Sequence, residues 1–101
     1  MFKIKAPTKK LKEICSSLGE PYIIRVFDYE NVIYRNLGNA YDFEISGLNN
    51  NRQLFNATIY IWQLKGGTRI IETIPNIKSL DDLKTVLETI VAEYSKLIKL
   101  S

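Results

Sequence analysis

The sequence predicts an α+β fold, a five-stranded antiparallel meander sheet with an N-terminal and a C-terminal helix packed on one face. Apolar residues recur with helical spacing near both ends of the chain, and they alternate with polar residues between residues 21 and 77. Turns rich in glycine and asparagine separate the alternating segments. The expected order is α-β-β-β-β-β-α in a single domain over residues 1–101, of which residues 1–7 could be a flexible basic arm.

The first helix is expected to begin after Thr8 and to end at Gly19. A threonine hydroxyl can accept a hydrogen bond from the first turn of a helix, and a glycine followed by Pro21 is typical of a helix end. The apolar face between these positions consists of Leu11, Ile14, Cys15 and Leu18. Cys15 therefore packs as a small hydrophobic residue.

The last helix is expected to follow Ser79. Ser79 and Asp82 have the spacing of a capping box, and negative charge is favourable in a first helical turn. The apolar face of this helix consists of Leu83, Leu87, Ile90, Tyr94 and Leu97. We expect both helices to cover the same face of the sheet.

A first hairpin is predicted around a two-residue turn at Gly38-Asn39. This turn sets the register of the two strands, and it places Tyr34 opposite Phe43 and Val32 opposite Ile45. Those four residues form the face that the helices should cover.

The same register places Arg35 opposite Asp42 and Ile33 opposite Glu44 on the other face, which the helices should leave open. Asp42 and Glu44 are the best pair of carboxylates in the chain for acid–base chemistry or a hard cation. A solvated strand face, with Arg35 across from Asp42, is the favoured explanation of this pair. An enclosed pocket at these two residues would favour an enzyme.

The segment FNATIYIWQL, residues 55–64, is the densest aromatic and β-branched run and is predicted to be a strand. One face of it, on the helix side, carries Phe55, Ala57, Ile59 and Ile61. The other face carries Asn56, Thr58, Tyr60, Trp62 and Leu64. An apolar second face indicates a second layer of core, a binding surface or a dimer interface.

Gly66-Gly67 is expected to turn this strand back into a fifth one, and two registers remain open. One register pairs Ile59 with Ile74 and Ile61 with Glu72. A slip of one residue pairs Ile61 with Ile71 instead and brings Ile70 beside Trp62.

Composition excludes several chemistries. The chain has no histidine and one cysteine, so a Ser-His-Asp triad, a Cys-His pair, a histidine-ligated metal and an intramolecular disulfide are all impossible within it. No glycine-rich phosphate loop occurs. We therefore expect no cofactor, no metal and no catalytic activity. No apolar run is long enough to span a bilayer or resembles a signal peptide, so a cytoplasmic location is expected.

The function predicted from these patterns is that of a small protein-binding or assembly module, such as an adaptor, an inhibitor or an accessory protein of a mobile element. An aromatic centre with a charged rim is typical of protein interfaces. The residues assigned to the interface are Tyr60, Trp62, Thr58, Ile33 and Arg35. A foreign protein and a second copy of the chain fit this surface equally.

The alternative function is that of a nucleic-acid-binding accessory protein. The first twelve residues contain no acid, and their lysines are Lys3, Lys5, Lys9, Lys10 and Lys12. Clustered lysines give a salt-dependent affinity for phosphates. Against this alternative, Asp42 and Glu44 on the aromatic face would repel a phosphate backbone.

Overall fold

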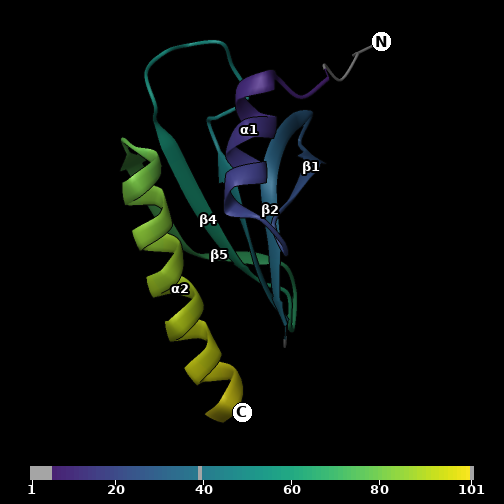
Figure 1. Cartoon of the computed structure of the whole chain (residues 1–101). Coiled ribbons are helices and arrows are strands. Elements are labelled where there is room, and N and C mark those ends of the chain that lie inside the picture. The colour runs from purple at the N-terminus through teal and green to yellow at the C-terminus, as the bar shows by residue number, and fades with distance from the viewer. Residues whose placement is uncertain (1–5, 39, 101) are drawn as a thin grey trace.

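A computed structural model describes residues 6–38 and 40–100 of the chain, and the side chains in this range as far as Lys96. The elements in chain order are α1 (Lys9–Leu18), β1 (Ile23–Phe27), β2 (Glu30–Gly38), β3 (Tyr41–Ser46), β4 (Ala57–Gln63), β5 (Arg69–Ile77) and α2 (Leu80–Leu100). The five strands form one open antiparallel sheet in the order β1-β2-β3-β4-β5, and both helices lie on the same face of it (Figure 1). The predicted fold class is confirmed.

The hydrophobic core lies between the helices and the sheet. Strands β2, β3 and β4 supply most of its sheet layer, which contains Ile33, Phe43, Ile45, Ala57, Ile59 and Ile61. The helix layer contains Leu11, Ile14, Leu83, Leu87, Ile90 and Tyr94. These are the positions that helical and strand spacing predicted, with one exception in β2 that is described below.

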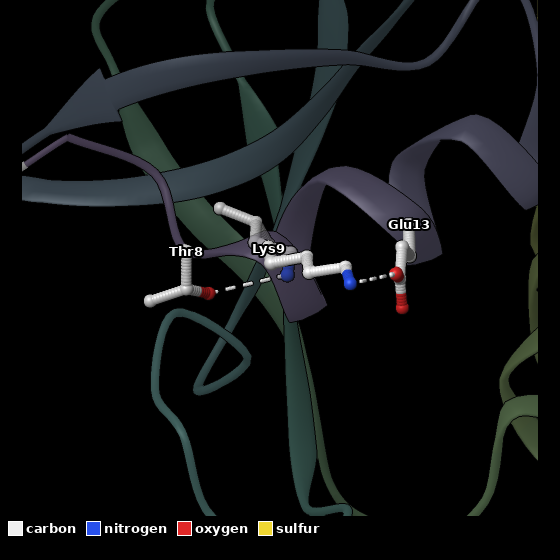
Figure 2. A network of polar contacts seen from close by, with 4 residues as sticks. Thr8, Lys9 and Glu13 are labelled. Atoms are coloured by element: carbon white, nitrogen blue, oxygen red, sulfur yellow. Dashed lines mark hydrogen bonds and ion pairs between the residues drawn. The ribbon is translucent and has the colours of Figure 1, made fainter.

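Helix α1 begins and ends at the expected residues. The Oγ1 atom of Thr8 accepts a hydrogen bond of 3.2 Å from the backbone N–H of Leu11, and Gly19 ends the helix with a φ angle of +74°. Figure 2 shows this cap, together with Lys9, whose Nζ atom lies 3.8 Å from a carboxylate oxygen of Glu13. An exposed pair of this kind adds little to stability.

Helix α2 begins at the predicted cap, since the Oγ atom of Ser79 accepts a hydrogen bond of 3.0 Å from the N–H of Asp82. Its apolar face is buried as expected as far as Tyr94, and the side chain of Leu97 lies outside the described residues. Neither α1 nor α2, as far as the structure describes them, combines the length and the apolar character that a membrane crossing requires.

The predicted register of the first hairpin is wrong by one residue. Ile33 pairs with Ile45 and Arg35 pairs with Phe43. The cause is an irregularity between Asn36 and Gly38, where Leu37 has no partner across the ladder. A single extra residue turns every following side chain of a strand to the opposite face.

The faces of β2 are therefore exchanged relative to the prediction. Ile33 and Arg35 lie on the helix-covered face, while Val32 and Tyr34 lie on the open face. Asn36 stabilises the irregular segment, because its Oδ1 atom accepts a hydrogen bond of 2.6 Å from the N–H of Gly38. Short-range signals did not distinguish this bulge from a simple two-residue turn.

The second hairpin combines the two registers left open. Ile59 pairs with Ile74, yet Trp62 pairs with Ile70, because Ile71 is an extra residue between the partners of Ile61 and Trp62. The bulge keeps apolar residues of β5 opposite β4 on both faces. It also interrupts the ladder of an edge strand, which disfavours pairing with another chain there.

Candidate binding pocket on the open sheet face

The open face carries a small second layer of packing. The rings of Phe27 in β1 and Trp62 in β4 contact each other with centroids 5.6 Å apart, although two strands separate them in the sheet. Val32 in β2 is only 1% exposed, although no helix covers this face. Twist and curvature of the sheet bring the edge strand toward its centre. Trp62 is thus half-buried and is held in place by a tertiary contact.

Two carboxylates are buried beside these rings. Asp42 and Glu44 of β3 are 9% and 8% exposed. The indole Nε1–H of Trp62 donates a hydrogen bond of 3.0 Å to Oε1 of Glu44, and the hydroxyl of Tyr34 donates one of 2.7 Å to Oδ2 of Asp42. Neutral aromatic donors therefore satisfy one oxygen of each carboxylate and supply no positive charge.

Within the part of the chain that the structure describes, no cation lies within ion-pair distance of Asp42 or Glu44. The ion pair found there joins Lys9 to Glu13 in α1. Arg25 lies nearby, but its guanidinium stacks on the ring of Tyr34 at 4.6 Å from the centroid. Buried charges are normally paired, and these two carboxylates have no ion-pair partner among the described residues.

The carboxylates line a pocket of about 340 Å³. Its other walls include Arg25, Phe27, Tyr34, Trp62, Leu64 and Thr68. Apolar and aromatic walls with a few convergent polar groups are typical of binding sites, and this volume is near the lower end of their usual range. A pocket at Asp42 and Glu44 is the feature that would favour an enzyme on sequence grounds, and the structure contains a partly open pocket there.

The electrostatics of the pocket are dominated by negative charge. Burial raises the pKa of the Glu44 carboxyl, and the nearby carboxylates of Glu30, Asp28 and Asp42 raise it further, while the hydrogen bond from Trp62 lowers it. Burial also raises the pKa of the Tyr34 hydroxyl, and its bond to Asp42 acts in the same direction. A bound cation would relieve the repulsion among these carboxylates.

Replacement of Glu44 by glutamine should stabilise the protein at neutral pH. The folded-state pKa of Glu44 lies above its unfolded value, so its contribution to the free energy of unfolding is favourable below the unfolded pKa and is lost as pH rises through the folded pKa. Glutamine keeps an acceptor for Trp62 and does not ionise. Thermal unfolding from pH 3 to pH 8 should give Glu44→Gln a higher Tm than the wild type at pH 7 and a similar Tm at pH 3.

The control for this pH series is Glu13→Gln, which removes an exposed carboxylate of α1. It should show no comparable gain at neutral pH. A difference between Glu44→Gln and the wild type that stayed constant at every pH would contradict the burial of an ionised carboxylate at Glu44.

Three of the predicted interface residues lie on the expected face. Trp62 lines the pocket, and Thr58 and Tyr60 lie half-buried on the same side of β4. The expected positions of Ile33 and Arg35 are wrong, because the bulge in β2 places both under the helices, and Ile33 is fully buried in the core.

Three residues that shape the pocket were not expected there from the sequence, which are Phe27, Val32 and Tyr34, whereas Arg25 was expected at the rim of this face. Alternation along IIRVF in β1 puts Arg25 and Phe27 on one face, and this was the available signal. It does not reveal that Phe27 reaches across two strands to Trp62.

The described lysines of the alternative prediction, Lys9, Lys10 and Lys12, do not gather around this pocket. Lys3 and Lys5 lie outside the described residues, and Lys9, Lys10 and Lys12 belong to α1 on the opposite face of the sheet. The Nζ atom of Lys10 is engaged in a loop. It donates to Oδ1 of Asn50 at 2.9 Å and to the backbone oxygens of Arg52 and Leu54 at 3.0 and 3.2 Å.

Within residues 6–38 and 40–100, no group of three or more acidic or cysteine side chains is arranged to hold a metal ion. The pocket offers two carboxylates, and its aromatic walls favour an organic cation over a hydrated one. Comparison of the chain with protein-family models, curated proteins and solved structures found no match.

Proposed function

We propose that the protein is a non-catalytic binding module that captures an arginine or lysine side chain of a protein partner in the pocket of its open sheet face. The observation that carries the proposal is the pair of buried carboxylates, Asp42 and Glu44, to which the described residues supply no cation within ion-pair distance. A guanidinium or ammonium would form charge-assisted hydrogen bonds with the carboxylate oxygens that the aromatic donors leave free.

The walls of the pocket suit the rest of such a side chain. Aromatic faces attract organic cations, and the methylene stem of arginine or lysine packs well against Phe27, Trp62 and Leu64. A volume of about 340 Å³ is small for an independent ligand and adequate for one side chain.

The surface around the pocket supports a protein as the partner. Exposed apolar side chains of Phe27, Leu64 and Ile70 lie at or beside its mouth on the open face. A central charged anchor surrounded by apolar contacts is the arrangement in which arginine dominates binding energy at protein interfaces. A cytoplasmic partner is in keeping with the single free cysteine of the chain.

The proposal can be tested through Trp62, which is the only tryptophan and lines the pocket. Two degenerate pentapeptide libraries without aromatic residues should be titrated against the full chain. They differ only at the central position, which is arginine in one and the neutral analogue citrulline in the other. The arginine library should change the Trp62 emission and lose affinity as salt rises, and the citrulline library should bind at least about tenfold more weakly.

Matched variants separate the pocket from general electrostatics. The double variant Asp42→Asn/Glu44→Gln should lose the response to arginine, whereas Glu13→Gln should keep it. Affinity for the arginine library should also fall as pH is lowered through the raised pKa of Glu44, because protonation of Glu44 removes one of the two negative charges in the pocket. Equal binding of the two libraries, or binding that the double variant retains, would overturn the proposal.

Self-association is the other possibility, in which the pocket of one molecule binds a side chain of a second copy of the chain. A mass measurement in solution over a range of protein concentrations would reveal a dimer, and its loss in Asp42→Asn/Glu44→Gln would assign the pocket to self-association. The partner would then be a second copy of the chain and not a different protein.

Hydrolysis by the two carboxylates is the second candidate function, and the pocket is the observation that favours it. A carboxyl with a raised pKa beside a second carboxylate is the arrangement that glycosidases use for a general acid and its partner. The small volume and the hydrogen bonds that Tyr34 and Trp62 donate to the two groups favour binding instead. Turnover of chromogenic glycosides that Glu44→Gln abolishes would establish the enzyme.

A further inference from the structure

A second cavity lies on the opposite side of the sheet, between the two helices. It measures about 550 Å³ and is open to solvent along the crevice that the end of α1 forms with α2. Its apolar lining consists of Leu18, Leu87, Val91 and Ala92. This volume falls in the middle of the usual range for small-molecule sites.

Arg35 lines this crevice and is unusual for its position. It lies on the helix-covered face of β2, opposite the core residue Phe43. The Nε atom of Arg35 is buried and has no hydrogen-bond partner among the residues that the structure describes. Its Nη1 atom makes a single long hydrogen bond of 3.3 Å, to the hydroxyl of Tyr22, and its guanidinium lies 5.2 Å from the centroid of that ring.

Among the described residues, no carboxylate lies within ion-pair distance of Arg35. Glu20 and Glu88 also line the crevice, but neither lies within ion-pair distance of it, since the ion pair found within residues 6–38 and 40–100 is Lys9 with Glu13. Lys84 of α2 adds a second positive charge to the lining. A partly buried guanidinium without a counter-charge is costly in a folded protein, and a bound anion would supply that counter-charge.

We propose that this crevice binds a small molecule with an apolar body and a carboxylate head. The carboxylate accepts from the Nη atoms of Arg35 in charge-assisted hydrogen bonds, and Lys84 adds attraction from α2. The apolar body lies against Leu87 and Val91. This site is separate from the pocket at Asp42 and Glu44, which lies on the other face of the sheet.

The first test uses octanoate as the probe, with 1-octanol as its uncharged counterpart and octylammonium as its cationic one. Calorimetric titration of the full chain should show that octanoate binds at least about tenfold more tightly than either counterpart. Arg35→Leu should reduce the affinity for octanoate to that for 1-octanol. Lys84→Met, a change at an exposed helix position that leaves folding intact, should weaken octanoate binding by a smaller factor.

Stability measurements distinguish a ligand-binding arginine from a structural one. If the role of Arg35 is to bind a ligand, Arg35→Leu should unfold at the same temperature as the wild type or a higher one. The reason is that leucine removes a partly buried charge that has no ion-pair partner. A clear loss of stability in Arg35→Leu, together with unchanged octanoate binding in Lys84→Met, would overturn the proposal. Equal binding of octanoate and 1-octanol would overturn it as well.

The two proposals fail independently. Arg35→Leu should leave the response of Trp62 to the arginine peptides intact, and Asp42→Asn/Glu44→Gln should leave octanoate binding intact.

Discussion

Phe43→Ala is expected to lower the free energy of unfolding by about 3–5 kcal/mol. Phe43 lies in the central strand β3, is fully buried, and packs between the sheet and the helices, with its ring centroid 6.1 Å from that of Tyr22. Removing the ring deletes apolar contacts and leaves a cavity that surrounding strands cannot collapse into. The loss is a large part of the roughly 5–15 kcal/mol that a domain possesses.

Urea unfolding monitored by circular dichroism would measure this loss. The control is Leu54→Ala, because Leu54 is 81% exposed and its truncation should change stability by no more than about 0.5 kcal/mol. A similar small effect for both variants would mean that Phe43 is not in the core.

Gly47→Ala is expected to be the second severe change. Gly47 follows β3 with a φ angle of +90°, which residues with a Cβ atom adopt only at a cost of roughly 1–2 kcal/mol. An added Cβ would also lie 2.7 Å from the backbone oxygen of Asn56, a contact too short for any Cβ atom. Because the obstacle is backbone, the loop between β3 and β4 has to shift, and overpacking of this kind adds about 1–3 kcal/mol.

Gly38→Ala is a matched control for this effect. Gly38 has a φ angle of +86°, yet no atom lies within 4 Å of an added Cβ. The Gly38→Ala variant should therefore lose only the stability that the positive φ angle costs, with no added cost from a steric clash. Equal losses of Tm in Gly47→Ala and Gly38→Ala would show that the approach of Asn56 to Gly47 is not tight.

Much of the fold could be predicted because its signals are local. The caps at Thr8 and Ser79, the glycine at position 19 and the spacing of apolar residues in both helices depend only on neighbouring residues. Alternation through β3 and β4 identified their buried faces, since one residue in two points to each side of a strand. These signals were sufficient for the order of elements and for the layer that covers the sheet.

The faces of β2 could not be predicted in this way. Its sequence, ENVIYRNLG, has apolar residues at both odd and even positions, so either face of the strand could be buried. The bulge at Leu37 decides between them, and its position depends on how the whole strand packs against β3 and the helices. For this reason Arg35 was expected on the open face and lies instead in the crevice between the helices.

The sequence by itself determined the architecture, the excluded chemistries and the aromatic character of the second face of β4. The tertiary structure alone decided that Phe27 contacts Trp62 and that Asp42 and Glu44 are buried beside them with no ion-pair partner among the described residues. It also decided that Nε of Arg35 is buried on the other side without a hydrogen-bond partner among those residues. The reason is physical. Spacing along the chain reports which face a residue occupies, whereas pockets arise from sheet twist, bulges and contacts between strands that are distant in sequence.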